Sequence, residues 1–476
     1  MANKQPTILK FGGTSVGDTK AFDRVASIIL DRMEALPVVV VSAMSGVTDA
    51  LLGSVRMAAD GFIDEAIRSL EPDFERHLTV VKNLCNRETA EVGRTLDDAR
   101  RSISSQLHLL SQQPRALRRL QDEIVSHGER LSAMVLTKVL RERGLAAAHV
   151  DARRCIITDE EHGCAGPLWP ETELHTKAEV EPLLDDSIVP VLGGFIGATT
   201  SGLTTTLGRG GSDFTAALVG AALSAREIQI WTDVTGVLTA DPRLVKSART
   251  ITRLSYAEAA ELAYFGAKVL HPKTVHPAVD RGIPIRICNS RAPLETGTII
   301  GHESEISPRG IKAIAHKTGI TTLQISSGRM LGAYGFLRSL FEVFERHRTV
   351  VDVVTTSEVS VSLSLDNPSA LSAILNDLEQ LGTVEIENHR AIICVVGEGL
   401  RSTSGIAGRV FGTLRDINIS LISQGASRIN LTFVIDEAHV EEAVSRLHKA
   451  FFEADLEETG AGTETATYEG TVRTSS

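Results

Sequence analysis

Short, uninterrupted apolar runs that alternate with helix-like stretches are the feature that most constrains the fold of this chain. Up to about residue 305 these runs read TILKF, VVVVSA, SIVPVLGGFIG, EIQIWTDV and IPIRIC. Strands with one wet face alternate apolar and polar residues, whereas continuous runs are typical of strands buried on both faces. The pattern therefore predicts an α/β layer sandwich with a largely parallel sheet.

The ends of these runs indicate where a ligand would bind. Most of the runs end at Gly, Ser, Thr or Asp, the residues that a phosphate or carboxylate site uses. In such sheets, ligands bind beyond the carboxyl ends of the strands. Residues 63–143, by contrast, are charged, poor in glycine and helically periodic, so we expect a helical insertion that covers the sandwich.

Composition narrows the class of partner. The chain has a net charge of −11 and no run of Lys and Arg, so it lacks the basic surface that nucleic-acid binding needs. Its five cysteines are scattered and never spaced as CxxC, which argues against a disulfide framework or a zinc cluster. No apolar signal segment begins the chain, and its longest apolar runs are too short for a membrane span. We expect a cytoplasmic protein that acts on a small molecule.

The C-terminal third contains an internal repeat. One copy runs from Gly335 to Asp366 and the other from Gly405 to Asp436, so both ends keep one offset (405 − 335 = 70 and 436 − 366 = 70). With the strand before it, each copy reads as strand, glycine turn, helix, strand, strand. Two copies are too few for a solenoid and predict a paired module.

The stretch KFGGTSVG places Lys10 at the end of the first predicted strand, just before Gly12 and Gly13. It is not a P-loop, because that motif puts its lysine after the glycines, and it lacks the GxG start of a dinucleotide fingerprint. The two glycines would leave backbone N–H groups open to an anion, as in a phosphate nest. The alternative is a plain glycine turn beside a solvated lysine.

A second glycine cluster, TTTLGRGGSDFTAAL, surrounds Arg209 and opens an alanine-rich helix with Asp213 in its first turn. Helix N-termini favour anions through the helix dipole and free N–H groups. Asp213 could simply be the N-cap of this helix, but Arg209 is a natural bidentate partner for a carboxylate. Two anion sites in one chain predict a phosphoryl donor and an acidic acceptor.

Three further stretches are less specific. WTDVTGVLTADPR places Thr232, Asp233, Asp241 and Arg243 on turns, for which ordinary Asp-Pro turn chemistry is the alternative. Lys268 alone would be a solvated surface lysine. Ser255 and Glu258 have the spacing of a capping box, before a helix that Gly266 would end, so we expect a structural role for Glu258. Ser126 and Glu129 have the same spacing, which leaves the role of Glu129 ambiguous. Three histidines lack metal-ligand spacing, and we expect core or surface roles for them: His162, His271 and His276.

Six motifs, in this order, resemble those of aspartate kinase: KFGGTSV, VVVVSAMSGVTDAL, SHGERLSA, GGFIGATTSGLTTTLGRGGSDFTAAL, IWTDVTGVLTADPR and FGAKVLHPKT. The resemblance runs from Lys10 to about Glu453. It implies an amino-acid-kinase fold, which is a three-layer α/β/α sandwich, followed by two ferredoxin-like ACT modules. The implied segments are a catalytic domain (1–305), a strand that joins the second module (306–320), the first module (321–387), the second module (388–456) and a disordered tail (457–476).

The resemblance also implies the activity, which is ATP-dependent phosphorylation of the β-carboxylate of L-aspartate, the first step toward lysine, threonine and methionine. Lys10 would neutralise the transferring phosphoryl group, Arg209 would clamp a substrate carboxylate and Glu129 would take the substrate ammonium. We favour an orienting role for Asp213, because the acceptor carboxylate is ionised at pH 7 and needs no general base. Further residues implied in the aspartate pocket are Ser42, Thr48 and Phe195.

The ATP site implied by the motifs has Mg²⁺ bridging the phosphates, with few direct protein ligands. Leu238 departs from the family pattern, which often has an aromatic residue there. The implied nucleotide contacts are Lys10, Gly12, Gly13, Ser15, Gly210, Gly211, Ser212, Thr232, Asp233, Leu238, Asp241, Arg243 and Lys268.

The first module resembles the effector site of lysine-sensitive members, and Asp352 would take a cationic side chain. Lysine is therefore the favoured inhibitor and threonine stays open. ACT modules usually pair across subunits, so a homodimer or larger assembly is expected. The implied effector residues are Met330, Gly335, Phe336, Leu337, Asp352, Thr356, Ser357 and Glu358.

Two rival functions remain. One is a kinase for another acid, glutamate or N-acetylglutamate, against which the aspartate-type motifs and the paired modules weigh. The other is a catalytically inactive amino-acid sensor. That reading needs Lys10, Arg209 or Asp213 to be lost, and all three are present.

Overall fold

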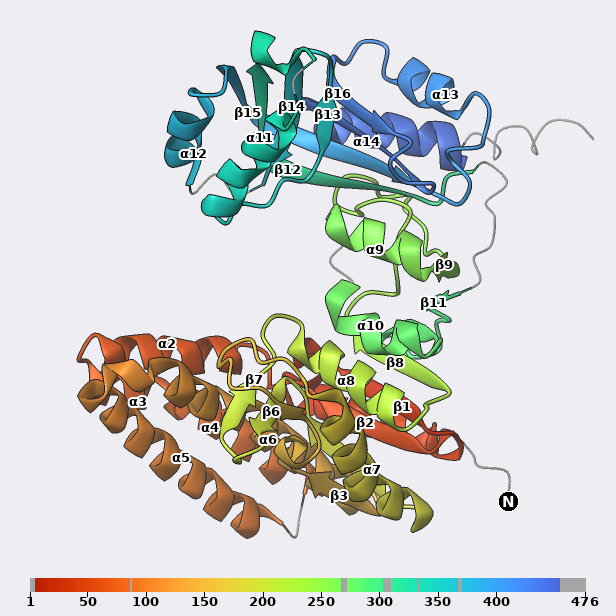
Figure 1. The fold of residues 1–476 in the computed structure, drawn as a ribbon. Coiled ribbons are helices and arrows are strands. Elements are labelled where there is room, and N and C mark those ends of the chain that lie inside the picture. The colour runs from red at the N-terminus through yellow and green to blue at the C-terminus, as the bar shows by residue number, and fades with distance from the viewer. Residues whose placement is uncertain are drawn as a thin grey trace, which may run out of the picture. The chain divides into compact units, whose positions relative to one another are not determined.

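The computed structural model describes residues 5–85, 88–266, 272–302, 310–332, 334–366 and 370–453. The chain divides into two units, Met1–Val237 with Thr250–Glu305 and Leu238–Arg249 with Ile306–Ser476. Figure 1 shows both units and labels most of their helices and strands. In these described ranges, no helix is long and apolar enough to cross a membrane.

A sheet of eight strands runs through the first unit in the order β3-β5-β2-β1-β8-β10-β11-β9. Its strand pairs are parallel apart from β10 with β11, so the predicted largely parallel sheet is confirmed. The strands are β1 (Thr7–Phe11), β2 (Pro37–Val41), β3 (Ala147–Val150), β5 (Val189–Gly193), β8 (Glu227–Thr232), β9 (Arg253–Ser255), β10 (Ile285–Asn289) and β11 (Thr298–Gly301).

Alternation along β1 decides which helices meet which face of this sheet. Leu9 and Phe11 share a buried cluster with residues of α1, α2 and α6, whereas Ile8 lies close to Gly220 of α8 on the opposite face. Lys10 shares the face of Ile8 and points toward the layer of α8, because successive strand side chains alternate. The α/β/α layers are thus as predicted. These helices are α1 (Thr19–Leu30), α2 (Val47–Ala59), α6 (Leu117–Glu142) and α8 (Gly211–Ala222), with α7 (Trp169–Asp185) and α10 (Pro272–Asp280) beside α8.

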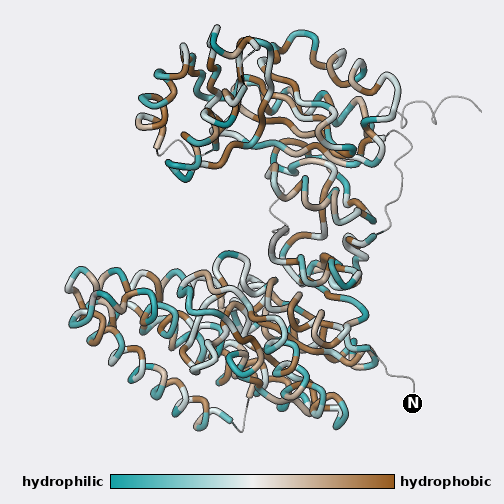
Figure 2. Tube along the Cα trace, in the orientation of Figure 1, coloured by the Kyte–Doolittle hydropathy of each residue, from teal (hydrophilic) through white to brown (hydrophobic). Residues whose placement is uncertain are grey.

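The stretch predicted to be a helical cover is helical, and its apolar faces extend the buried cluster on the α6 side. Figure 2 shows hydrophobic segments along the strands of both units, and alternating hydrophobic and hydrophilic residues along α5. A small sheet, β4-β6-β7, lies apart from the main one. Ser255 and Glu258 form the predicted capping box of α9. The remaining elements of the unit are α3 (Ile63–Ser69), α4 (Glu71–Leu84), α5 (Thr89–Gln112), α9 (Tyr256–Tyr264), β4 (Ile157–Thr158), β6 (Ile196–Thr199) and β7 (Thr204–Thr206).

The second unit is built on a six-stranded sheet in the order β13-β14-β12-β15-β17-β16. Residues 313–317 of β12 pair with 392–396 of β15, and residues 320–326 pair with 383–390, so one strand serves both copies of the repeat. The elements are β12 (Ala313–Ser326), β13 (Val354–Thr356), β14 (Ser360–Leu365), β15 (Thr383–Val396), β16 (Ile419–Gln424), β17 (Asn430–Asp436), α11 (Phe336–Arg346), α12 (Leu371–Leu378), α13 (Ile406–Thr413) and α14 (Val440–His448).

The repeat is visible in the two helices that open its copies. Gly335 is the N-cap of α11 with a φ of 87°, and Gly405 is the N-cap of α13 with a φ of 78°. Both lie in the left-handed region, which glycine enters without steric cost. The 70-residue offset therefore marks one turn geometry used twice.

The segment Leu238–Arg249 lies within the first unit in sequence but packs in the second, whereas the predicted division placed it in 1–305. Ala240 and Val245 belong to the buried cluster of the second unit. Thr239 accepts a backbone hydrogen bond from Ile314 at 2.8 Å, and its hydroxyl lies 2.9 Å from Nε2 of His448. The predicted disordered tail, 457–476, lies outside the described residues.

Candidate active site

A cavity of about 640 Å³ opens at the carboxyl ends of β1, β2 and β5, the edge that the strand ends predicted. It is lined by the loops after these strands, the middle of α6 and the N-terminus of α8. The structure thereby brings together eleven residues predicted from sequence: Lys10, Gly13, Ser42, Thr48, Glu129, Phe195, Arg209, Gly210, Gly211, Ser212 and Asp213.

An ion pair forms the charged end of this cavity. Nζ of Lys10 lies 2.6 Å from Oδ1 of Asp213, and the two side chains are 11% and 16% exposed. Gly210 is the N-cap of α8 and offers no side-chain acceptor, so the alternative that Asp213 is the N-cap of this helix is excluded. The first turn of α8 thus has backbone N–H groups without a side-chain cap, which together with Lys10 suit a phosphoryl group.

The glycine pair after Lys10 differs from prediction in one respect. The N–H of Gly12 donates to the carbonyl of Trp231 at 3.1 Å, so it is not open to an anion. Ser15 is buried, and its hydroxyl donates to Trp231 at 3.3 Å and to Ser290 at 2.9 Å. The plain-turn alternative therefore describes Gly12 and Ser15, whereas Gly13 lines the cavity.

The sequence GGF, which begins at the last residue of β5, allows two helices to approach the cavity. A Cβ atom on Gly193 would lie 3.0 Å from the backbone of Glu129 in α6, and one on Gly194 would lie 2.7 Å from Cβ of Ser212 in α8. Phe195 has a φ of 68°, and it is held there because its N–H donates to Thr215 at 3.0 Å. A strained residue fixed in this way is common at ligand sites.

Glu129 lies in the middle of α6, with only 3% of its surface exposed. The hydroxyl of Ser126 donates to the carbonyl of Glu123, so the capping-box alternative is excluded. Burial raises the pKa of Glu129 to about 8, although backbone N–H groups of Ala43 and of Glu129 itself partly oppose the shift. A carboxyl group in this state gains its charge when a cation binds beside it.

The other predicted nucleotide residues that the structure describes do not line this cavity. Thr232 donates to Asp233 at 3.2 Å in the turn after β8. Asp241 accepts hydrogen bonds from the guanidinium and the N–H of Arg243, which hold the pKa of that carboxyl below its usual range, as ordinary turn chemistry would. Leu238 belongs to the same segment of the second unit. Lys268 and His271 lie outside the described residues.

The predicted effector residues belong to the second unit, and Asp352 is already paired. Its carboxylate, 2% exposed, lies 3.3 Å from Nζ of Lys317, which also pairs with Asp366 at 2.8 Å. Gly335 caps α11, and the hydroxyl of Ser357 lies 2.8 Å from that of Ser360. The other effector residues flank these: Met330 before α11, Phe336 and Leu337 at its start, Thr356 at the end of β13, and Glu358.

No motif singled out Asp122, which lines the cavity and is 1% exposed. It lies seven residues before Glu129 (129 − 122 = 7), so both face the same side of α6, and this spacing was the available signal. Other cavity residues that sequence reasoning missed are Ala43, Met44, Ser45, Gly46, Asp49, Leu52, Gln121, Val125, Gly163 and Thr206.

Comparison with known proteins gives consistent matches. The amino acid kinase family matches residues 5–289, and an ACT domain matches residues 393–451. The chain is 37% identical over 456 residues to the lysine-sensitive aspartokinase 3 of Escherichia coli, covering 94% of this chain and 99% of that protein. It is similar to E. coli aspartokinase III solved with aspartate and ADP, at 36% identity and a TM-score of 0.78 over 94% of this chain and 100% of the other. The same enzyme solved with lysine and aspartate has 37% identity, the same TM-score and the same coverage.

Proposed function

The chain belongs to the amino acid kinase family and, within it, to the aspartokinases, and from this premise we propose how its cavity performs the reaction. An oxygen of the aspartate β-carboxylate bonds to the γ-phosphorus of ATP while the bond from that phosphorus to ADP breaks. The products are 4-phospho-L-aspartate and ADP. The observation that carries the proposal is the Lys10–Asp213 ion pair at the start of α8, in one cavity with Glu129 and Arg209.

Lys10 neutralises the phosphoryl group as it transfers, and Asp213 orients the Lys10 ammonium. The acceptor carboxylate is ionised at neutral pH, so the reaction needs no general base. Positioning and charge stabilisation then account for catalysis, as in other phosphoryl transfers. The uncapped first turn of α8 supports a phosphate position between this pair and the helix.

Two further side chains hold the carboxylate and ammonium groups of aspartate that do not react. Arg209 binds a substrate carboxylate, and Glu129 pairs with the substrate ammonium. Both side chains line the same cavity as Lys10, and a buried carboxyl such as Glu129 gains most from an incoming cation. This arrangement leaves the β-carboxylate facing the phosphoryl group. Ser42, Thr48 and Phe195 complete the pocket walls.

We infer that Mg²⁺ accompanies ATP and is held mainly by phosphate oxygens and water. Within the described ranges, no group of three or more His, Cys, Asp or Glu side chains is placed to hold a metal ion. Mg²⁺ usually keeps several of its waters and binds through one or two carboxylates and the substrate phosphates. When bound, the ion supplies neutralisation of phosphate charge. The residues near β8, such as Thr232 and Asp233, would contact the rest of the nucleotide.

Lysine is the favoured feedback inhibitor, and the first ACT module is its proposed site. The E. coli relative is lysine-sensitive and has been solved with lysine bound. Here Asp352 already holds the Lys317 ammonium, which supports a site of the right charge for a lysine side chain. The same module would pair with a second subunit in a homodimer. Exposed apolar side chains on and near α11 support this: Leu331, Tyr334, Leu337, Phe341, Val350 and Val359.

The reaction is tested by trapping the acyl phosphate with hydroxylamine in the presence of Mg-ATP, with L-aspartate or L-glutamate as acceptor. We expect hydroxamate with aspartate only. Lys10→Met should lower kcat by about 10²–10³-fold, the usual effect of removing one charge-stabilising group from a reacting centre. Lys20→Met, an exposed lysine in α1, is the matched control and should leave kcat unchanged.

Two results would contradict this assignment. Glutamate turnover above that of aspartate would favour the rival acid kinase, and turnover of neither acid would favour the sensor. A Lys10→Met protein that turns over at the wild-type rate would remove Lys10 from the reaction.

A further inference from the structure

Asp122 is a buried carboxylate that joins three separate elements. Its Oδ1 accepts a hydrogen bond from the hydroxyl of Thr206 in β7 at 2.6 Å. Its Oδ2 lies 2.9 Å from Nδ1 of His162 and accepts a hydrogen bond from the N–H of Gly163 at 3.0 Å. A carboxylate at 1% exposure is costly unless such donors satisfy it, so α6, β7 and the loop at 162–165 are held together here.

The two elements that Asp122 binds, β7 and the 162–165 loop, both lie close to Arg209 or to the turn before it. β7 ends at Thr206, three residues before Arg209 (209 − 206 = 3). A Cβ atom on Gly208 would lie 3.3 Å from Sγ of Cys164 and 3.4 Å from the carbonyl oxygen of Gly163, so the turn before Arg209 rests on the 162–165 loop. Ala165 also donates a backbone hydrogen bond to Thr206 at 2.9 Å.

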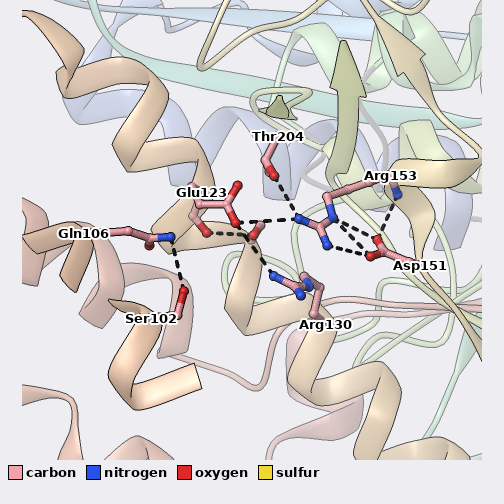
Figure 3. A network of polar contacts seen from close by, with 8 residues as sticks. Ser102, Gln106, Glu123, Arg130, Asp151, Arg153 and Thr204 are labelled. Carbon is pink, nitrogen blue, oxygen red and sulfur yellow. Dashed lines mark hydrogen bonds and ion pairs between the residues drawn. The ribbon is translucent and has the colours of Figure 1, made fainter. Parts of the chain in front are cut away.

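Glu123, the residue after Asp122 in α6, is linked through Arg153 to Thr204 at the start of β7, as Figure 3 shows. Nη1 of Arg153 donates to Thr204 at 3.0 Å and lies 3.6 Å from Oε1 of Glu123, while Asp151 pairs with Nη2 of Arg153 at 2.7 Å. Glu123 thus reaches β7 through Arg153 but makes no hydrogen bond to the 162–165 loop among the described residues. The two adjacent acidic residues of α6 therefore have separable tasks.

We propose that Asp122 is a positioning residue for the reaction, because it fixes the 162–165 loop and β7 and so fixes the backbone from which Arg209 reaches the substrate carboxylate. The inference rests on the proposed role of Arg209. Arg209 itself is exposed and makes no ion pair with another residue in the described part of the chain, so its direction depends on the backbone that carries it. A displacement of about 1 Å in such a group can cost about 10²-fold in rate.

The kinetic test uses the full-length chain and compares Asp122→Ala with Glu123→Gln. For Asp122→Ala we expect kcat/KM for aspartate to fall about 10²-fold through a higher KM for aspartate, with the KM for ATP within about twofold of wild type. Glu123→Gln removes an adjacent negative charge and should change the aspartate KM far less. Equal changes in both variants, or a rise confined to the KM for ATP, would overturn the proposal.

Cys164 supplies a readout that does not depend on catalysis. Of the five cysteines, Cys164 is exposed and the other four are buried, so iodoacetamide under native conditions should label Cys164 first. We expect faster labelling of Cys164 in Asp122→Ala than in wild type, and a wild-type rate in Glu123→Gln. An unchanged labelling rate in a folded Asp122→Ala protein would overturn the fixing role, even if wild-type protein failed to phosphorylate aspartate.

If Asp122→Ala does not fold, His162→Ala decides. It removes one of the three donors while Thr206 and Gly163 still satisfy the carboxylate. We then expect several-fold faster labelling of Cys164 and a several-fold higher KM for aspartate. A His162→Ala protein that matches wild type in both quantities would sink the proposal.

Discussion

At the scale of single residues, the charge of Glu129 depends strongly on its burial. Its pKa of about 8 leaves the carboxyl largely neutral at pH 7, and a neutral carboxyl cannot pair with the substrate ammonium. We therefore expect the KM for aspartate to fall as pH rises from 6 to 8, by up to about tenfold per pH unit, and then to level off. Initial rates from pH 6 to 9 measure this, and a flat profile would contradict it.

The variant Glu129→Gln is the control for this prediction, and it should have a high KM for aspartate at every pH. The sign of the stability effect is also fixed. The pKa of Glu129 is higher in the folded state than in the unfolded state. Its contribution to the free energy of unfolding is therefore fully present below about pH 4.5 and is lost as pH rises through 8. Glu129→Gln should therefore melt at a higher temperature than wild type at pH 8.5.

Residue types and spacing could predict part of this site. Lys10 and Asp213 were each recognisable as part of an anion site, but their pairing needed the fold, since they are 203 positions apart (213 − 10 = 203). Glu129 was ambiguous because a capping box and a buried ligand group share the same spacing. Asp122 was missed because its three partners come from distant segments, and no local pattern records them.

At the scale of elements, β12 places the ammonium of Lys317 beside the first copy of the repeat. The register of β12 against β15 shifts between Lys317 and Ile320, where pairing passes from one copy of the repeat to the other. Lys317 thereby reaches Asp352, just before β13, and Asp366, just after β14. The resemblance implied that residues 306–320 join the second module, but the residues alone could not predict this change of partner, because register depends on long-range pairing.

The same geometry predicts competition between Lys317 and free lysine. Asp352→Asn should weaken lysine inhibition about tenfold or more. Lys317→Met removes one cation from Asp352, and a buried charge that has lost a partner gains more from an incoming ammonium, so lysine should inhibit at lower concentration. Inhibition curves with lysine and threonine measure this. Equal shifts for both inhibitors would contradict it, since the threonine side chain carries no cation.

At the scale of the whole molecule, the segment Leu238–Arg249 interrupts the sequence of the first unit but contributes to the stability of the second. Val245 is 5% exposed in the second unit's buried cluster, and Val245→Ala should lower the free energy of unfolding by about 1–2 kcal/mol. Hydrogen exchange should then accelerate in β17 and α14, but not in β1 and β8. Acceleration confined to β1 and β8 would contradict the assignment.

The division of the chain between catalytic and regulatory parts was predictable only as a boundary in sequence. The continuous apolar runs and the 70-residue repeat both point to a change near residue 305. Neither pattern records that the turn-rich stretch TADPR, residues 239–243, places its own Ala240 in the core of the second unit. Its apolar residues are few, and their burial is decided by partners about 200 positions away, such as His448.

This shared segment has a consequence for how such proteins can be recombined. A chimaera joined at residue 305 would bring a kinase half and a regulatory half from two relatives, but the kinase half would carry a foreign piece of the regulatory core in Leu238–Arg249. Ala240 and Val245 would then face side chains that were never selected to pack with them. A chimaera that takes Leu238–Arg249 and residues 306 onward from the same relative keeps all parts of that core from one protein. The segment that must be exchanged as a unit is therefore discontinuous in the gene.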